Sequence, residues 1–255
     1  MVEQKFDEVP WTIQQTFLGI ALTLVPWIAL ALLLDLFTGS AVSSSKPFPP
    51  QVDLINAIIT FILSSLIEGA FLIAPLYFAV RAYRSSPHKW SKAFEALGYR
   101  GFRIERALMW IVVLIVAILA VDNLYQYIID VLHLHLQTND QVLLARSKLE
   151  PLTIYATLLV AVFVAPFCEE TYFRSFVFMG FTRAMPLIWA IIFSALVFGV
   201  AHADPGSFAV LVIIGLALAF LRWRTNSIWP GMMLHALNNA IAAIAVVLYM
   251  NGVLH

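Results

Sequence analysis

The sequence predicts an all-α membrane protein, a polytopic bundle of about seven transmembrane helices within a range of about six to eight. The first observation is composition: 62% of the residues are hydrophobic and only 12% are charged, whereas soluble globular domains are about half apolar and about a quarter charged. The second is a series of apolar segments that reach the roughly 20 residues needed to cross a bilayer. The formal net charge is zero, so no basic excess indicates a nucleic-acid partner.

Seven segments have the length and apolar character of membrane-spanning helices. The fourth is the longest, so we expect it to tilt in the bilayer or to kink at Pro166. The sixth is short. The connection between the third and fourth segments has the apolar spacing of a helix lying at the membrane surface. The segments are Thr12–Phe37, Leu54–Val80, Ala107–Ile128, Leu152–Thr182, Pro186–His202, Ser207–Leu221 and Ile228–Met250.

The connection after the second segment is strongly basic and sets the expected orientation. Because cytoplasmic loops carry an excess of Lys and Arg, we expect this connection to lie in the cytoplasm. With seven crossings, the amino terminus then lies inside and the carboxy terminus outside. The basic residues of this connection are Arg81, Arg84, Lys89, Lys92, Arg100, Arg103 and Arg106.

Polar residues at membrane depth divide the chain near Glu150. We expect residues 1–150 to form amino-terminal transmembrane helices with the basic cytoplasmic loop, and residues 151–255 to form a helical core with most of the polar groups. Ionisable side chains are costly inside a membrane and usually mark a functional site. We interpret Glu68 and Asp122 as helix-packing or cavity-lining groups. The other candidates are Glu169, Glu170, Arg174, His202, His235 and the neutral Asn239.

Two adjacent glutamates in the fourth segment have different predicted roles. Glu170 and Arg174 are four residues apart on one helical face, so they can form a structural salt bridge. Glu169 points about 100° away from Glu170, and no basic residue stands three or four positions from it. An unpaired carboxylate of this kind can act as a general base. The alternative is a neutral carboxyl group held by a hydrogen bond.

Two histidines supply the remaining parts of a hydrolytic site. His202 ends the stretch FGVAH in the fifth segment, and His235 shares a face with Asn239 in the stretch HALNN of the seventh. A glutamate and a histidine can deprotonate water, and a second histidine with an amide can donate hydrogen bonds to an oxyanion. Helix counting puts His235 nearer the cytoplasmic edge than Glu169, so convergence requires a tilted helix or a shifted boundary. Taken separately, each histidine could instead lie at a helix end or join two helices.

Three short patterns in this order resemble those of a known family. EETYFR fits EExxxR, FGVAH fits FxxxH and HALNN fits HxxxN. On successive membrane helices they resemble the CAAX protease and bacteriocin-processing family, also called the Abi or CPBP family, whose eukaryotic relatives are the type II CAAX prenyl endopeptidases. The resemblance covers about Leu152–Ala245. It implies an intramembrane endopeptidase that acts on a membrane-bound or lipidated peptide or protein.

The resemblance also implies a role for each motif residue. Glu169 would activate water with the help of His202. His235 and Asn239 would form the oxyanion hole. The residues that would support the site are Glu170 and Arg174.

A zinc ion is an open alternative for this site. Glu169, His202 and His235 could ligate zinc as a set of two histidines and one carboxylate. The sequence contains no HExxH pattern, and we favour a metal-free hydrolase whose activity survives strong chelators.

The expected location is the plasma membrane of a bacterium or the endoplasmic reticulum of a eukaryote, with the chain crossing it several times.

Three other functions remain open from the sequence. A proton-coupled transporter could use Glu68, Asp122, Glu169 and the two motif histidines as a proton relay. A non-catalytic immunity or scaffold protein could keep the same fold. A cysteine protease would use Cys168, the single cysteine, but a thiol in apolar surroundings is inert.

Overall fold

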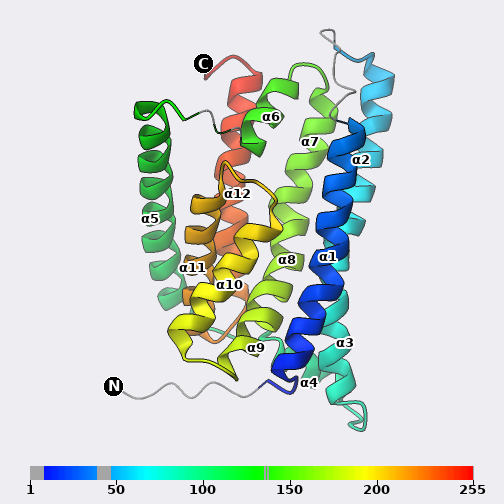
Figure 1. Cartoon of the computed structure of the whole chain (residues 1–255), viewed down its shortest axis with the longest axis vertical. Coiled ribbons are helices and arrows are strands. Elements are labelled where there is room, and N and C mark those ends of the chain that lie inside the picture. The colour runs from blue at the N-terminus through cyan, green and yellow to red at the C-terminus, as the bar shows by residue number, and fades with distance from the viewer. Residues whose placement is uncertain (1–8, 39–46, 135, 137, 255) are drawn as a thin grey trace.

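The structure, a computed structural model, is a bundle of long helices lying roughly side by side (Figure 1). It describes residues 9–38, 47–134, 136 and 138–254, and this part of the chain contains no strand. The predicted all-α class is confirmed. Five of the helical segments described are long and apolar enough to cross a bilayer, so the chain is an integral membrane protein. They are Pro50–Ala82, Ile104–Val131, Pro151–Thr182, Phe208–Thr225 and Trp229–Met250.

All seven predicted segments are helical. The other two contain shorter apolar helices, Ile13–Ala29 and Leu187–Ala201. A turn at Phe71 and Leu72 divides the second segment into two helices, and a further helix lies in the basic connection, where none was predicted. The elements are α1 (Ile13–Thr38), α2 (Pro50–Ala70), α3 (Ile73–Ala82), α4 (Lys89–Ala96), α5 (Ile104–Val131), α6 (Asn139–Arg146), α7 (Pro151–Leu159), η1 (Val160–Val164), α8 (Ala165–Glu169), η2 (Glu170–Phe178), α9 (Met179–Thr182), α10 (Leu187–Ala201), α11 (Phe208–Thr225) and α12 (Trp229–Met250).

A short helix, α6, is present in the connection between the third and fourth segments, and its predicted place at the membrane surface stays a prediction. Its amino terminus carries a capping box, in which the Thr138 hydroxyl accepts from Gln141 N and the Gln141 side chain accepts from Thr138 N. This arrangement satisfies backbone N–H groups that have no partner inside a helix. Figure 1 shows α4 and the start of α1 at one end of the bundle and the end of α12 at the other. The side of the membrane on which each end lies stays a prediction.

The fourth segment is one continuous helix that changes from α-helical to π-helical turns at two places. The turns η1 and η2 are π-helical, with α-helical residues between them. The N–H group of Ala165 bonds to the carbonyl of Val160, five residues back, and Pro166 has no N–H group. The expected effect of Pro166 therefore takes the form of a wide turn before the proline. Wide turns of this type occur frequently at functional sites.

The π-helical turn η2 lies at the centre of the bundle. Every residue from Glu170 to Phe178 is buried. The Phe71 ring packs against the rings of Tyr172 and Phe173, with centroid distances of 5.2 and 5.6 Å. A Cβ on Gly180 would overlap the Thr16 side chain, so this glycine permits the close approach of α1. The amino-terminal helices thus cover the segment that carries the EExxxR motif.

The start of α7 is held by a side chain from α2. Asp53 is buried and accepts hydrogen bonds from Leu152 N at 2.8 Å, Thr153 N at 3.0 Å and Thr153 Oγ1 at 2.8 Å. A carboxylate at a helix amino terminus satisfies free N–H groups and interacts favourably with the helix dipole. This contact joins the two parts of the chain on either side of Glu150.

The connection between α10 and α11 lies within the length of the bundle, because these two helices are shorter than α5 and α12 (Figure 1). Hydrogen bonds hold it from two sides. Trp27 Nε1 donates to the Ala201 carbonyl at 2.8 Å, and the Tyr125 hydroxyl donates to the Gly206 carbonyl at 2.5 Å. His202, which follows α10 directly, is therefore inside the bundle.

Candidate active site

Glu169 and His202 face each other across a short gap. Glu169 ends α8 and is 8% exposed, while His202 caps the carboxy terminus of α10. His202 Nε2 lies 3.8 Å from Glu169 Oε2. This distance is too long for a direct hydrogen bond, and the buried Oε2 atom has no hydrogen-bond partner in the described part of the chain. Both atoms therefore remain available for a small molecule between them.

The orientation of the His202 ring is set by its own helix. His202 Nδ1 lies 2.9 Å from the Phe198 carbonyl. A carbonyl can only accept a hydrogen bond, so Nδ1 carries a proton. In the neutral form of the ring, Nε2 is then unprotonated and acts as an acceptor. The His202 nitrogen that faces Glu169 is thus the unprotonated, basic nitrogen of the neutral ring.

Glu170 connects Arg174 with His235 in a second, deeper group. Glu170 Oε1 lies 3.3 Å from Arg174 Nη1 and 3.1 Å from His235 Nδ1. All three residues are at most 3% exposed. A Cβ on Gly231 would lie 2.9 Å from Glu170 Oε2, so this glycine lets α12 approach the carboxylate closely. The structure contains the predicted Glu170–Arg174 pair and adds His235 to it.

The Phe198 ring contacts both groups. Its centroid is 4.4 Å from the centre of the His202 ring and 5.8 Å from that of His235. The guanidinium carbon of Arg174 lies 4.1 Å above the same ring, at the distance of a cation–π contact. The phenylalanine of the FxxxH motif thus packs against both histidines and also stabilises the buried arginine.

Asn239 binds the backbone of the wide turn η1. Its Nδ2 atom donates to the Ala161 carbonyl at 2.8 Å. This carbonyl is free because Pro166, five residues on, has no N–H group and Ala165 bonds to Val160 instead. The asparagine is therefore joined to the segment that carries Glu169, and its second Nδ2 hydrogen remains available.

Two residues from the amino-terminal half reach the same segment. Glu68 of α2 interacts electrostatically with Glu169, and its buried Oε2 atom has no hydrogen-bond partner among the described residues. The Tyr99 hydroxyl lies 2.6 Å from Thr171 Oγ1, and the Thr171 hydroxyl donates to the Phe167 carbonyl. Burial raises the pKa of Tyr99 to about 12, so Tyr99 stays protonated at neutral pH and donates to Thr171.

The sequence predicts Glu68 to be a helix-packing or cavity-lining group and does not single out Tyr99. Glu68 was visible as an intramembrane carboxylate, but its position beside Glu169 depends on how α2 packs. Asp122 is half-buried on α5, and no hydrogen bond or ion pair joins it to the motif residues in the part of the chain described. Cys168 is buried.

The residues of the site do not fit a zinc ion. Within the described ranges, no group of three or more His, Cys, Asp or Glu side chains has an arrangement that could hold a metal. His235 Nδ1 is directed at Glu170, and the Phe198 ring packs against both His235 and His202. The alternative set of Glu169, His202 and His235 is therefore not assembled as a metal site.

Comparison with known proteins finds similarity in the carboxy-terminal part of the chain. Residues 151–241 match the family model described as type II CAAX prenyl endopeptidase Rce1-like. This range contains all three motifs. The Bacillus subtilis (strain 168) protein named "Putative membrane peptidase YdiL" is 30% identical over 106 residues, which are 42% of this chain and 42% of that protein.

A second relative comes from Mycoplasma capricolum subsp. capricolum and is named "Uncharacterized protein"; it is 30% identical over 146 residues, 52% of this chain and 42% of its own length. The chain thus aligns with less than half of either relative. No solved structure gives a significant match to the chain. The family resemblance predicted from the motifs is confirmed: residues 151–241 are similar to the type II CAAX prenyl endopeptidases of the Rce1-like family.

Proposed function

We propose that the chain is an intramembrane endopeptidase that uses a water molecule activated by Glu169 and His202. The observation that carries this proposal is the pair of acceptor atoms, His202 Nε2 and Glu169 Oε2, 3.8 Å apart. An ionised carboxylate and an unprotonated imidazole nitrogen both accept hydrogen bonds. A molecule that bridges them must donate two hydrogens, and water does this while its oxygen lone pairs remain free for attack.

The proposed reaction is the hydrolysis of a peptide bond. The water oxygen attacks the carbonyl carbon of the substrate while one water proton passes to Glu169 Oε2. A carbon–oxygen bond forms, and the carbonyl electron pair moves to its oxygen. The carbon–nitrogen bond then breaks as the proton on Glu169 passes to the leaving nitrogen. The products are an amine and a carboxylic acid.

His235 and Asn239 are the proposed donors to the oxyanion. His235 Nδ1 donates to Glu170, so its Nε2 can donate only when the ring is an imidazolium. Asn239 would donate its second Nδ2 hydrogen. Preorganised donors of this kind typically contribute about 3 kcal/mol each to transition-state stabilisation.

The proposed substrate is a membrane-bound or lipidated peptide or protein. Its peptide bond must reach a site formed by helices of a membrane bundle, and a membrane-anchored chain is already concentrated in the bilayer. Because both relatives are bacterial, we expect the enzyme to act in a bacterial plasma membrane. The named peptidase relative supports this class of reaction, and the motif residues support the roles.

The test compares membrane peptides from cells that produce the wild type, Glu169→Gln or Glu105→Gln. Glu105 is an exposed glutamate in the first turn of α5, so it is the matched control. We expect uncut precursors to accumulate only with Glu169→Gln. Identical peptide profiles for all three proteins, at equal membrane levels, would refute the proposal.

Metal dependence is tested on the purified protein. We expect cleavage of an identified precursor to survive strong chelators, because the proposed steps use only side chains and water. Loss of cleavage that zinc restores would replace this mechanism with a metal-dependent one.

A proton-coupled transporter is the second candidate, and the position of Glu68 favours it. Two carboxylates from different helices that interact electrostatically inside a membrane protein could pass a proton between them. Purified protein in vesicles discriminates the two functions. A transporter would show proton flux that Glu68→Gln and Glu169→Gln abolish, without any peptide cleavage.

A further inference from the structure

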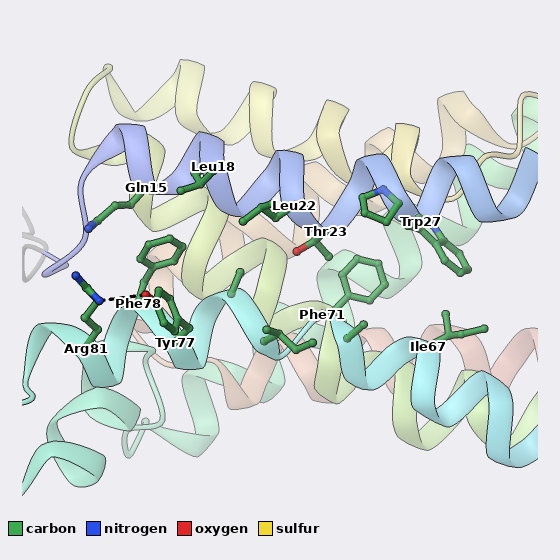
Figure 2. A pocket seen from close by; sticks show the side chains of 14 residues that line it. Gln15, Leu18, Leu22, Thr23, Trp27, Ile67, Phe71, Tyr77, Phe78 and Arg81 are labelled. Carbon is green, nitrogen blue, oxygen red and sulfur yellow. Dashed lines mark hydrogen bonds between the residues drawn. The ribbon is translucent and has the colours of Figure 1, made fainter.

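A groove on the outside of the bundle is separate from the proposed active site. It lies between α1 on one side and α2 and α3 on the other (Figure 2). Its volume is about 710 Å³, and most of the side chains that line it are apolar. The groove belongs to the amino-terminal helices, outside the matched residues 151–241.

The charged side chain of the groove lies at one end, and one hydroxyl group, that of Thr23, lies further along. Figure 2 shows Gln15 of α1 and Arg81 of α3 near each other at this end. Arg81 Nη1 donates to the Tyr77 hydroxyl at 3.1 Å. Arg81 forms no salt bridge with an acidic side chain in the described part of the chain. Its positive charge is therefore available to a ligand that enters the groove.

Apart from Thr23, the remainder of the groove is apolar and has the length of an acyl chain. Leu18, Leu22 and Phe71 lie along it, and Trp27 and Ile67 lie at the far end (Figure 2). From Gln15 to Trp27 the helix rises about 18 Å, at about 1.5 Å per residue. One leaflet contributes about 15 Å to the hydrocarbon core of a bilayer. A chain that starts beside Arg81 can thus extend through one leaflet within the groove.

We propose that this groove binds an anionic phospholipid. The phosphate lies against Arg81 and Gln15, and one acyl chain follows α1 towards Trp27. The polar end is also the end at which the basic connection begins, since Arg81 is in the last turn of α3. Basic residues beside a membrane surface attract anionic headgroups. The order of a charged end followed by an apolar length fits a phospholipid.

The apolar end of the groove contacts the elements that hold the candidate active site. Trp27 donates to the Ala201 carbonyl, next to His202, and the Phe71 ring packs against Tyr172. An acyl chain against Trp27 and Phe71 therefore holds both side chains in these positions. Lipid binding itself does not depend on the proposed peptidase activity.

The test uses photo-crosslinking of the full-length protein in lipid nanodiscs. Each nanodisc contains a trace of phosphatidylglycerol or phosphatidylcholine with a diazirine on one acyl chain, and mass spectrometry locates the labelled peptides. We expect phosphatidylglycerol to label the α1 and α3 groove residues about fivefold more than phosphatidylcholine, because one basic residue near the surface contributes about 1 kcal/mol.

Two substitutions, each with a matched control, separate the two parts of the proposed site. Arg81→Gln removes the charge and should make the two lipids label equally, whereas Arg84→Gln, at an exposed position outside the groove, should not. Ala70→Phe fills the groove and should reduce labelling by both lipids. Ala21→Phe places the same side chain at an exposed position of α1 outside the groove and should leave labelling unchanged.

Equal labelling by the two lipids in the wild type would overturn the proposal, as would an unchanged lipid preference in Arg81→Gln. A diazirine-bearing apolar peptide tests whether the groove binds a polypeptide instead of a lipid. If this peptide labels the groove and phosphatidylglycerol does not, the groove binds a polypeptide and the proposal is wrong. Melting temperatures of all variants establish that each one is folded.

Discussion

The two adjacent glutamates allow a test in which nearly identical substitutions lower stability by very different amounts. Glu170→Gln keeps the shape of the side chain but removes the charge beside Arg174, which is 1% exposed. Breaking a buried ion pair by neutralising one partner costs about 3–5 kcal/mol, because the other charge remains buried. Glu169→Gln removes a carboxylate whose Oε2 has no hydrogen-bond partner in the described chain. We expect it to cost less than about 1 kcal/mol.

The assay is thermal unfolding of the purified variants in one detergent, combined with the peptide comparison in cells. About 3–5 kcal/mol corresponds to a fall in melting temperature of roughly 10 °C for Glu170→Gln, and we expect Glu169→Gln to melt within a few degrees of the wild type. Glu169→Gln should nevertheless lose cleavage completely. Equal melting temperatures for the two variants, or a larger loss for Glu169→Gln, would refute the assignment of one glutamate to support and the other to chemistry.

Three further substitutions test how the site is held. Gly98→Ala should cost roughly 1–2 kcal/mol in thermal unfolding, because Gly98 has a φ of +86° and an added Cβ would lie 2.5 Å from Arg222 Nη2; an unchanged melting temperature would contradict this. Tyr99→Phe should cost about 1 kcal/mol at pH 7 through the lost Thr171 hydrogen bond. Because burial raises the pKa of Tyr99 from 10.0 to about 12, the wild type should lose stability as pH rises between these values and Tyr99→Phe should lose less, as seen in melting curves over that range. Asp53→Ala should cost about 2–3 kcal/mol, because α7 loses its cap; urea unfolding with no change in midpoint would exclude this role.

Much of the fold follows from hydropathy alone. A bilayer demands long apolar helices whose backbone groups are satisfied internally, so all seven predicted segments are helices in the structure. The division of the second segment at Phe71 could not be predicted, because its apolar character continues through the turn. The π-helical turns of the fourth segment were also not predicted. Pro166 indicated a disturbance, but its form depends on Asn239, which lies 73 positions further along the chain.

The site was predictable in its parts and less so in its connections. The spacing of Glu170 and Arg174 predicts their pair directly. The bond between His235 and Glu170 depends on the packing of α12 against η2, which the spacing within each motif does not determine. Helix counting placed His235 nearer the cytoplasmic edge than Glu169, yet His235 Nδ1 lies 3.1 Å from Glu170 Oε1, so the two helices do bring these residues together.

Residues that hold the candidate site come largely from the half of the chain that carries none of the three motifs. Asp53 caps the helix that leads to Glu169, Trp27 binds the backbone beside His202, and Tyr99 binds the residue after Glu170. A boundary near residue 150 stays a prediction, but these contacts cross it in three places. The motifs supply the reactive groups Glu169 and His202, whose facing atoms lie 3.8 Å apart. This spacing depends on the amino-terminal helices. Precise positioning is a large part of catalysis, so the amino-terminal helices are part of the candidate active site in energetic terms.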